Sequence, residues 1–349
     1  MSTSLRSYAS SLAATVRSAV QDFPRQRLPL LCAAGVGLTA WASWMWWRRK
    51  RGERLELKQV GIVSQLLIYP IKSCRAVSVP EADCIGLGLR KGDLRDRHWL
   101  VVTEDGHMVT GRQEPRMVLI SVSVQGDSLY LDGPGMKEKL LVPMSLPKSN
   151  KVRDCRVFGT DIQGRDCGEE ASRWLTSYFQ SGKPYYLVHF EADTMRPRKS
   201  KEKEKLFRET DVIAYPDASP IMLLSEASLE DLNKRLEEPV SLGNFRPCIV
   251  VSDCEAFSED NWHDITVGTC RLKRVMACGR CILTTVSPDT GIMTRQEPLD
   301  TLRTFRKSDP TLSHLYKNSP LFGQYYGVEQ TGKLRVGDPV YRVITKDQH

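Results

Sequence analysis

The sequence predicts a strand-rich α+β protein with one transmembrane helix near its N-terminus. Three observations indicate this fold class. Residues 28–47 are an uninterrupted uncharged stretch, long enough to span a bilayer as a helix. From Gln59 onward, short runs of Val, Ile and Leu are separated by Gly and Pro turns, which is typical of strands. Few segments have helical spacing, so we expect a small β-barrel with inserted helices in the second half.

Four segments follow one another along the chain. Residues 1–27 carry four arginines against one acid, a composition typical of mitochondrial targeting segments. Residues 28–47 end in tryptophans and precede four cations at 48–51, the pattern of a membrane boundary that leaves the C-terminal body in the cytosol. A secretory signal would have a shorter apolar core and small residues at a cleavage site. We expect two further domains, at 56–185 and 186–346.

Composition excludes several classes of protein. The chain has 349 residues, room for about two domains of ordinary size. Its ten cysteines are scattered and too few for a small disulfide scaffold, which indicates mostly reduced thiols. The net charge of +8 lies partly in the N-terminal region, and no stretch interleaves cations with aromatic residues. Nucleic-acid binding is therefore not indicated.

In the first domain, periodicity predicts five strands and one amphipathic helix. The strands are Val60–Pro70, Trp99–Thr103, Met117–Val124, Ser128–Asp132 and Leu140–Pro143, and the helix is Glu169–Gln180. The first strand runs into a polar loop that contains Lys72 and Ser73. Arg97 stands in a cluster of charges directly before a strand that has the composition of a buried one, where a guanidinium could hold an anion in a bidentate manner.

The second domain begins with a basic segment, Arg196–Lys205, which predicts a solvated loop or a docking patch for an acidic partner. Further predicted strands are Ile221–Leu224, Cys248–Ser252, Cys270–Ala277 and Cys281–Val286, and a capping box predicts a helix that starts at Ser228. A short helix is expected at Leu299–Arg306 because Pro298 suits its first turn. Arg246 precedes a strand, between Phe and Pro, and is well placed to point into a site.

A short sequence is repeated in the two halves. Arg112–Pro115 and Arg295–Pro298 both read RQEP, and each follows a glycine-containing turn. A match of four residues can arise by chance, so an internal duplication is only a hypothesis. Its physical content is that both halves present an Arg-Gln-Glu cluster from similar turns.

Cys278 and Cys281 stand two residues apart and are the strongest chemical signal in the chain. A structural zinc site needs four ligands, and no second paired motif supplies them. A thioredoxin-like pair would open a helix, whereas the β-branched residues after Cys281 predict a strand. Two buried thiols remain possible, as does a thiolate that ligates a soft metal beside an anionic, phosphate-bearing cofactor held by the cations. The residues alone do not name the metal.

Six motifs, in this order, resemble the MOSC-domain proteins, relatives of the C-terminal domain of molybdenum cofactor sulfurase. They are PIKSC (70–74), DRHWLVV (96–102), TGRQEPR (110–116), NFRPCIVV (244–251), MACGRCILTTVSPDTG (276–291) and LRVGDPVY (334–341). With its N-terminal anchor, the chain is similar to the mitochondrial amidoxime-reducing components within that family. The resemblance covers residues 56 to 346. It implies a MOSC N-terminal β domain, a MOSC β-barrel domain and Mo-molybdopterin bound between them.

The resemblance also implies roles for ten residues. Cys281 would be the molybdenum ligand and the catalytic centre. The remaining cofactor-binding positions would be Lys72, Ser73 and Arg97 from the first domain, and Ala218, Ser219, Pro220, Arg246, Gly279 and Arg280 from the second. The choice of Cys281 over Cys278 rests on the resemblance alone.

The implied reaction is the two-electron reduction of N-hydroxylated compounds such as amidoximes, hydroxylamines and N-hydroxyguanidines. Electrons would come from NADH through cytochrome b5 reductase and the outer-mitochondrial-membrane form of cytochrome b5. The protein would sit in that membrane by its single N-terminal span and face the cytosol, where confinement to one surface raises effective concentration. The basic segment 196–205 is a candidate docking element for the acidic cytochrome.

Two other hypotheses stay open from the sequence. A molybdenum cofactor carrier or sulfur-handling module would use a cysteine to hold persulfide or cofactor in transit. The chain has no preceding pyridoxal-phosphate-enzyme region, which argues against a full sulfurase. A zinc-stabilised membrane adaptor is the non-enzymatic alternative.

Overall fold

The computed structural model describes residues 56–199 and 206–344. The predicted targeting segment 1–27 and the predicted anchor 28–47 lie outside these residues. Within the part of the chain that is described, no helix has the length and apolar character needed to cross a bilayer.

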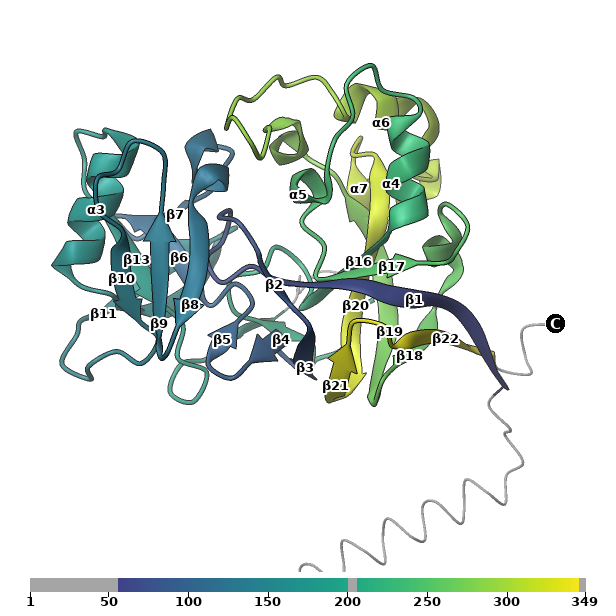
Figure 1. Cartoon of the computed structure of the whole chain (residues 1–349), viewed down its shortest axis with the longest axis horizontal. Coiled ribbons are helices and arrows are strands. Elements are labelled where there is room, and N and C mark those ends of the chain that lie inside the picture. Colours follow the sequence, from purple (N-terminus) through teal and green to yellow (C-terminus); the bar gives the residue numbers. More distant parts are fainter. Residues whose placement is uncertain (1–55, 200–205, 345–349) are drawn as a thin grey trace, which may run out of the picture. The chain divides into compact units, whose positions relative to one another are not determined.

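A closed barrel of seven strands organises the second half of the chain (Figure 1). Hydrogen-bonded neighbours follow the order β17-β16-β20-β19-β18-β22-β1, and β1 pairs with β17 to close the ring. The strands are β1 (Glu56–Ile68), β16 (Ile221–Ser225), β17 (Ile249–Ser252), β18 (Asp264–Val267), β19 (Cys270–Gly279), β20 (Leu321–Gln330) and β22 (Pro339–Ile344). A short strand, β2 (Val77–Val79), extends the sheet beyond β1. Closure leaves no open edge within the ring itself.

The first strand of the described chain therefore belongs to the same barrel as the last. The backbone N–H of Val63 donates to the carbonyl of Asp338 (2.9 Å), and the N–H of Gly337 donates to the carbonyl of Val63 (2.8 Å). The boundary predicted near residue 185 thus separates segments that share one barrel. The predicted division into 56–185 and 186–346 stays a prediction.

The other strands form four smaller sheets. A five-stranded sheet has the order β11 (Val152–Val157), β12 (Thr160–Asp166), β13 (Tyr185–His189), β6 (Trp99–Thr103) and β7 (Met108–Val109). A three-stranded sheet contains β10 (Leu140–Pro143), β9 (Ser128–Asp132) and β8 (Ser121–Gln125). A four-stranded sheet contains β21 (Gly332–Arg335), β3 (Glu81–Ile85), β4 (Gly88–Lys91) and β5 (Leu94–Arg95), and β14 (Arg198–Lys199) pairs with β15 (Val212–Ile213).

Helices are short and lie outside the barrel wall. They are α3 (Glu169–Phe179), α4 (Glu226–Asn233), α5 (Leu242–Phe245), α6 (Leu299–Phe305) and α7 (Ser313–Tyr316), with 3₁₀ turns η1 (Pro115–Leu119), η2 (Ser258–Asn261), η3 (Ile282–Thr285) and η4 (Pro310–Leu312). In Figure 1, α4, α5 and α6 gather at the upper end of the barrel, and β3, β4 and β21 lie at the lower end.

One hydrophobic core supports both halves of the described chain. It includes Leu66 of β1, Trp99 of β6 and Leu272 of β19, all with no measurable exposure. Full burial of such a side chain stabilises the fold by about 2 kcal/mol. Because these residues come from both halves, the loops at the ends of their strands pack against a common interior. Those loops carry the candidate site.

Most predicted elements with a strong pattern are confirmed. The strands β6, β9 and β10 have the predicted bounds, and α3 ends one residue earlier than predicted. Two predicted strands are wrong. Residues 117–124 divide into η1 and β8, because Pro115 begins a 3₁₀ turn. Residues 282–285 form η3, where the hydroxyls of Thr284 and Thr285 bond to carbonyls three residues earlier (2.9 and 2.8 Å).

Two further expectations need correction. The helix α4 begins one turn before the predicted start, with Ser225 as its N-cap, and Ser228 instead donates its hydroxyl to the buried Glu259 (2.7 Å). The basic segment 196–205 is not wholly solvated. Arg198 is only 5% exposed, and its guanidinium donates to the carbonyls of Ala214 (3.1 Å) and Pro216 (2.6 Å). These acceptors let a cation be buried without a carboxylate.

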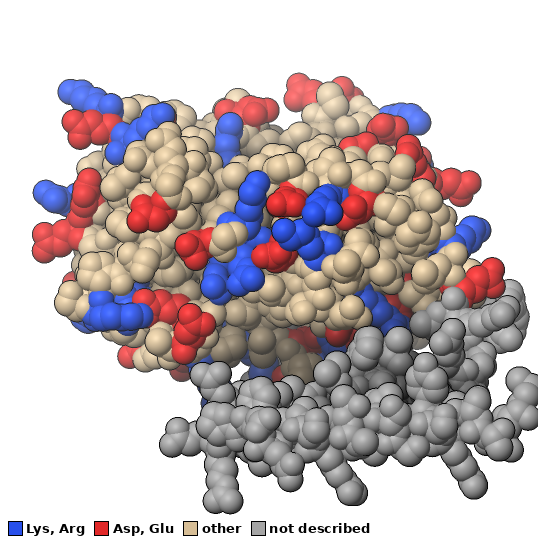
Figure 2. Space-filling model, turned by 60° about the horizontal axis from the view of Figure 1, so that its bottom comes forward, with Lys and Arg blue, Asp and Glu red and all other residues tan. Residues whose placement is uncertain are grey.

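Surface charge is mixed on the face drawn in Figure 2, where acidic and basic side chains are interspersed. A concentrated positive charge is found instead among partly buried side chains, in the cavity described next.

Candidate functional site

A cavity of about 100 Å³ lies where loops from both halves of the chain converge. Eight of the ten predicted site residues line it: Lys72, Ser73, Arg97, Ser219, Arg246, Gly279, Arg280 and Cys281. Ala218 and Pro220 do not. Ala218 is buried beside the cavity, and Pro220 packs its carbonyl close to Gly88. The roles assigned to these residues by resemblance remain predictions; what the structure supplies is their proximity.

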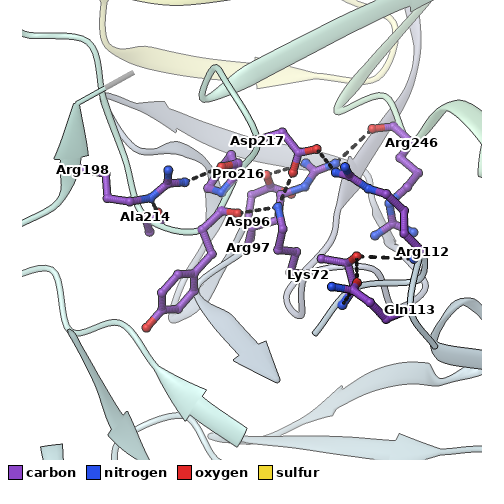
Figure 3. Close-up of polar contacts among 12 residues, drawn as sticks. Lys72, Asp96, Arg97, Arg112, Gln113, Arg198, Ala214, Pro216, Asp217 and Arg246 are labelled. Atoms are coloured by element: carbon purple, nitrogen blue, oxygen red, sulfur yellow. Dashed lines mark hydrogen bonds and ion pairs between the residues drawn. The ribbon is translucent and has the colours of Figure 1, made fainter. Parts of the chain in front are cut away.

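Lys72 reaches the cavity from the loop that follows β1 (Figure 3). Its ammonium donates to the carbonyl of Tyr215 (2.8 Å) and pairs with the carboxylate of Asp217, which also accepts from Arg112 (3.3 Å). Burial lowers the pKa of Lys72 to about 8, although Asp217 acts to raise it. Burial would raise the pKa of Asp217, but Lys72 and Arg112 outweigh it and lower that pKa to about 2. The side chain of Asp217 is 44% exposed, so solvent screens part of this interaction.

Arg97 is paired with a fully buried carboxylate, that of Asp96. One guanidinium nitrogen donates to Oδ2 of Asp96 (2.6 Å) and to the thiol sulfur of Cys248 (3.1 Å), and the other donates to the carbonyl of Arg246 (3.1 Å). Oδ1 of Asp96 accepts from the backbone N–H of Tyr69 (2.8 Å). Burial raises the pKa of the Cys248 thiol to about 11, against the pull of Arg97. This thiol is therefore neutral at physiological pH.

Tyr69 stands between two arginines. The guanidinium carbons of Arg97 and Arg246 lie 4.5 Å and 4.3 Å from the centre of its ring, within cation–π range. Burial raises the pKa of Tyr69 to about 12, although both arginines act to lower it. The ring thus stays neutral and fixes the positions of two cations that line the cavity.

Arg246 and Arg280 come from the barrel half and contact only uncharged acceptors. Arg246 donates to the carbonyls of Ser73 (3.4 Å) and Cys74 (2.7 Å). Arg280, 7% exposed, donates to the carbonyls of Phe322 (2.7 Å) and Phe245 (2.8 Å). Among the described residues, neither guanidinium has a carboxylate partner.

Arg280 packs close to Gly323 in the strand β20. Gly323 has a φ of +75°, and a Cβ there would lie 2.4 Å from Met222 and 3.3 Å from the guanidinium of Arg280. A larger residue would therefore displace either the core or the arginine.

Three residues that line this cavity have a left-handed backbone conformation. Ser73, Arg97 and Arg246 have φ values of 71°, 48° and 60°, in the left-handed region that residues with a Cβ rarely adopt. Such conformations cost about 1–3 kcal/mol each and persist where the surrounding structure imposes them, often at functional sites.

The two cysteines differ in exposure. Cys278, near the end of β19, is 3% exposed, and burial raises its pKa. Cys281 is half-buried and directly precedes η3, whose Thr284 N–H and hydroxyl both bond to the Cys281 carbonyl (3.0 and 2.9 Å). The amide of Asn244 also donates to the carbonyl of Thr284 (3.0 Å), tying this turn to α5. The Cys281 backbone is thereby fixed relative to Arg246.

The residues present fit an anionic, thiolate-ligated group such as Mo-molybdopterin. Four cations line the cavity and two carboxylates pair with them, which leaves two positive charges uncompensated. Lys and Arg are the usual partners of phosphate groups, and Cys281 offers a soft donor beside them. Across residues 56–199 and 206–344, no group of three or more His, Cys, Asp or Glu side chains is arranged to hold a metal ion.

Several residues of the site were not singled out from the sequence. They are Tyr69, Asp96, Asp217, Asn244 and Cys248. Asp217 lies between β15 and β16, but its partner Lys72 lies 145 residues away in the chain. Only Asp96 could have been identified from the sequence. It stands next to Arg97, and a buried guanidinium needs a carboxylate partner.

Both halves of the chain match known family models. Residues 60–182 match the family model described as the MOSC N-terminal beta barrel domain, and residues 210–341 match the MOSC domain. The cavity takes residues from both matched regions.

Full-length relatives agree with the family models. Mitochondrial amidoxime-reducing component 1 of Xenopus laevis is 71% identical over 331 residues, covering 95% of this chain and 96% of that protein. Mitochondrial amidoxime reducing component 2 of Bos taurus is 55% identical, covering 85% of this chain and 88% of that protein. Mitochondrial amidoxime-reducing component 1 of Homo sapiens is 54% identical, covering 89% and 90%. The chain belongs to the family of mitochondrial amidoxime-reducing components and carries their MOSC N-terminal and MOSC domains.

Proposed function

We propose that this chain is a molybdenum-dependent oxidoreductase that reduces N-hydroxylated compounds, among them amidoximes, hydroxylamines and N-hydroxyguanidines. The relatives at 71% and 54–55% identity are named for amidoxime reduction, and the MOSC domain family is associated with the molybdenum cofactor. The observation that carries the proposal is one cavity in which the half-buried thiol of Cys281 stands beside cations from both halves.

Each residue of the cavity has a physical task in this proposal. Cys281 is the thiolate ligand, because it is more exposed than Cys278 and its backbone is fixed by Thr284. Lys72, Arg97, Arg246 and Arg280 hold the anionic cofactor, and their partners keep them oriented before it binds. The cofactor, when bound, supplies the two-electron chemistry that takes oxygen from the substrate.

Lys72, which pairs with Asp217 at the cavity, is the candidate group for the proton balance. The reduction of an amidoxime to an amidine and water consumes two electrons and two protons. The Asp217 carboxylate is partly exposed and pairs with Lys72 and Arg112 beside the cavity. A lysine with a pKa of about 8 can also release and regain a proton near neutral pH.

The electron donors and the location also belong to the proposal. Electrons come from NADH through cytochrome b5 reductase and cytochrome b5, and the protein is anchored in the outer mitochondrial membrane by residues 28–47 with its body in the cytosol. The relatives' names support mitochondria, and the basic cations after residue 47 support this orientation. Among residues 196–199, Arg198 is excluded from docking by its burial. Any docking role falls to its exposed neighbours.

Reconstituted turnover tests the function. The full chain, loaded with molybdenum cofactor, is mixed with NADH, cytochrome b5 reductase and cytochrome b5, and benzamidine formation from benzamidoxime is measured. Turnover that requires all four components supports the reductase. Molybdenum and pterin bound at about one equivalent without turnover would instead indicate a cofactor carrier. Zinc at one equivalent without molybdenum would overturn both.

A further inference from the structure

A second cavity, of about 250 Å³, borders the first at the candidate metal ligand. Both cavities are lined by Arg280 and Cys281. The second is completed chiefly by Arg295, Arg303, Ile282 and Leu299, and we call it the arginine pocket. Arg280 and Cys281 therefore belong to the walls of both cavities.

The arginine pocket combines an apolar wall with positive charge. Leu299 is buried and Ile282 half-buried, which gives a surface for a ring or an aliphatic chain. Arg303 is 49% exposed and donates to Asp300 (2.6 Å). No ion pair of Arg295 occurs among the described residues. The one carboxylate, that of Asp300, pairs with Arg303 alone, so the charge of Arg295 is not neutralised and the pocket has a net positive charge.

Arg295 is held at this position by the turn that follows Cys281. Its φ is 65°, the same left-handed strain as at Ser73, Arg97 and Arg246. Its backbone N–H donates to the hydroxyl of Thr285 in η3 (3.1 Å), and the preceding N–H, that of Thr294, donates to the Thr285 carbonyl (3.1 Å). The segment that carries Arg295 is therefore fastened to the segment that carries the thiol.

We propose that the arginine pocket is a substrate subsite that selects N-hydroxylated compounds bearing an anionic group on an apolar ring or chain. The inference rests on the proposed reductase function. The ring lies against Ile282 and Leu299, the anionic group is bound by Arg295 and Arg303, and the N-hydroxyl group points toward Cys281. Guanidiniums bind carboxylates and phosphates with directed, charge-assisted hydrogen bonds.

The same charge favours release of the product. An amidoxime is neutral near pH 7, because the hydroxyl oxygen withdraws electrons and weakens the base. Reduction with two electrons and two protons breaks the N–O bond and gives an amidine and water. The amidine then binds a third proton and becomes a delocalised cation, like guanidinium itself. A pocket with a net positive charge repels this amidinium cation but does not repel the neutral amidoxime group from which it forms.

A matched pair of substrates tests the pocket. The full, cofactor-loaded chain is assayed with benzamidoxime and with 4-carboxybenzamidoxime, alone and as the double variant Arg295→Gln/Arg303→Gln. Arg335→Gln is the control, because Arg335 is an exposed arginine paired with one carboxylate, that of Glu81, and lines neither cavity. Binding of 4-carboxybenzamidoxime without NADH is measured by calorimetry, which reports affinity in the absence of turnover.

We divide kcat/KM for 4-carboxybenzamidoxime by kcat/KM for benzamidoxime, and we expect the double variant to lower this ratio about tenfold. Calorimetric binding of the carboxylated compound should weaken by a similar factor. Arg335→Gln leaves the ratio unchanged, and Arg295→Lys/Arg303→Lys, which keeps both charges, retains part of it. An unchanged ratio in a folded double variant would overturn the pocket. If the wild-type chain reduces neither substrate yet binds the carboxylated one selectively, the reductase function fails and the pocket stands.

Discussion

Two cations line each side of the cavity, but the two sides differ in the groups that bind these cations. On the side formed by the first half, Lys72 and Arg97 each bind a carboxylate, from Asp217 and Asp96. On the barrel side, Arg246 and Arg280 bind backbone carbonyls, and within the described residues neither pairs with an acid. Both cations that line the first side are therefore paired with an acid, whereas the two on the barrel side are not.

This difference separates two functions that a cation can have in a site. A buried ion pair such as Arg97–Asp96 costs desolvation and adds little net field, but removing one partner leaves the other unpaired. A guanidinium held by carbonyls keeps its full charge for a ligand. We therefore expect substitutions on the first side to affect folding and those on the barrel side to affect binding.

The largest effect is expected at Cys281, which comes from the barrel side. Cys281→Ser should abolish molybdenum-dependent reduction of benzamidoxime, because a hydroxyl is a poor replacement for a thiolate toward a soft metal. Cys278→Ser, at a thiol that is 3% exposed, should retain much of the activity. Turnover by both variants is measured together with their molybdenum content, and the reverse pattern would mean that the wrong cysteine was assigned.

Arg97→Gln tests the paired side through stability. It leaves the carboxylate of Asp96, with no exposed surface, without its cation, and such a loss costs about 3–5 kcal/mol. Chemical denaturation of Arg97→Gln and Arg246→Gln compares the two sides directly. Equal destabilisation by the two variants would contradict the proposed difference between the paired side and the barrel side.

Arg246→Gln tests the open side through binding. Removing a charge that no carboxylate neutralises should weaken anion binding about tenfold, since hydrogen bonds to charged groups contribute roughly 1.5–3 kcal/mol. Sulfate binding followed by calorimetry measures this without the cofactor. A normal sulfate affinity in Arg246→Gln would show that the barrel side does not hold anions.

Tyr69 couples the two sides, so its substitution sharpens the comparison. Tyr69→Leu removes a ring that contacts both Arg97 and Arg246, each contact contributing about 1 kcal/mol. Sulfate affinity should fall severalfold in Tyr69→Leu and be nearly normal in Tyr69→Phe, which keeps the aromatic face. Similar losses in the two variants would point to the hydroxyl instead.

The smallest effect is a pH dependence on the paired side. Lys72 has a folded pKa of about 8 against 10.5 for the unfolded chain, so sulfate affinity should weaken modestly as the pH rises past 8. Over the same window the folded state gains stability, because the unfolded lysine still binds a proton that the folded one has lost. Lys72→Met should flatten both profiles. A wild-type sulfate affinity that is constant from pH 7 to about 9.5 would contradict the lowered pKa.

The sequence predicted elements where local pattern and tertiary environment agree. The strand β6 is β-branched and fully buried over its first four residues, and α3 places its apolar side chains on one face. The long strand β20 was missed because Gly323 and Gly327 interrupt its pattern. Gly327 packs against Asp211, and Gly323 adopts a left-handed φ that Met222 and Arg280 require. In the sequence alone such glycines indicate turns, because the neighbours that require a glycine come from distant segments.

The site shows the same limit. Lys72, Arg97 and Arg246 were identifiable because each is a cation beside the end of a strand. Asp217 was not, because its contact with Lys72 spans 145 residues and leaves no local pattern. The only feature of the sequence that pointed to the arginine pocket was the RQEP repeat. Its two arginines both lie close to the candidate site. Arg112 binds Asp217, and Arg295 lines the pocket beside Cys281.

The closed barrel has a consequence for how the chain folds during synthesis. Strand β1 leaves the ribosome first among the seven, yet one of its two neighbours, β22, is the last to be made. Until then β1 and β17 can pair, but the ring stays open, and the edges at β1 and β18 are exposed to other chains. Pairing between segments so distant in sequence also slows folding. A nascent chain that stalls before residue 339 is therefore a substrate for chaperones and not a smaller working protein.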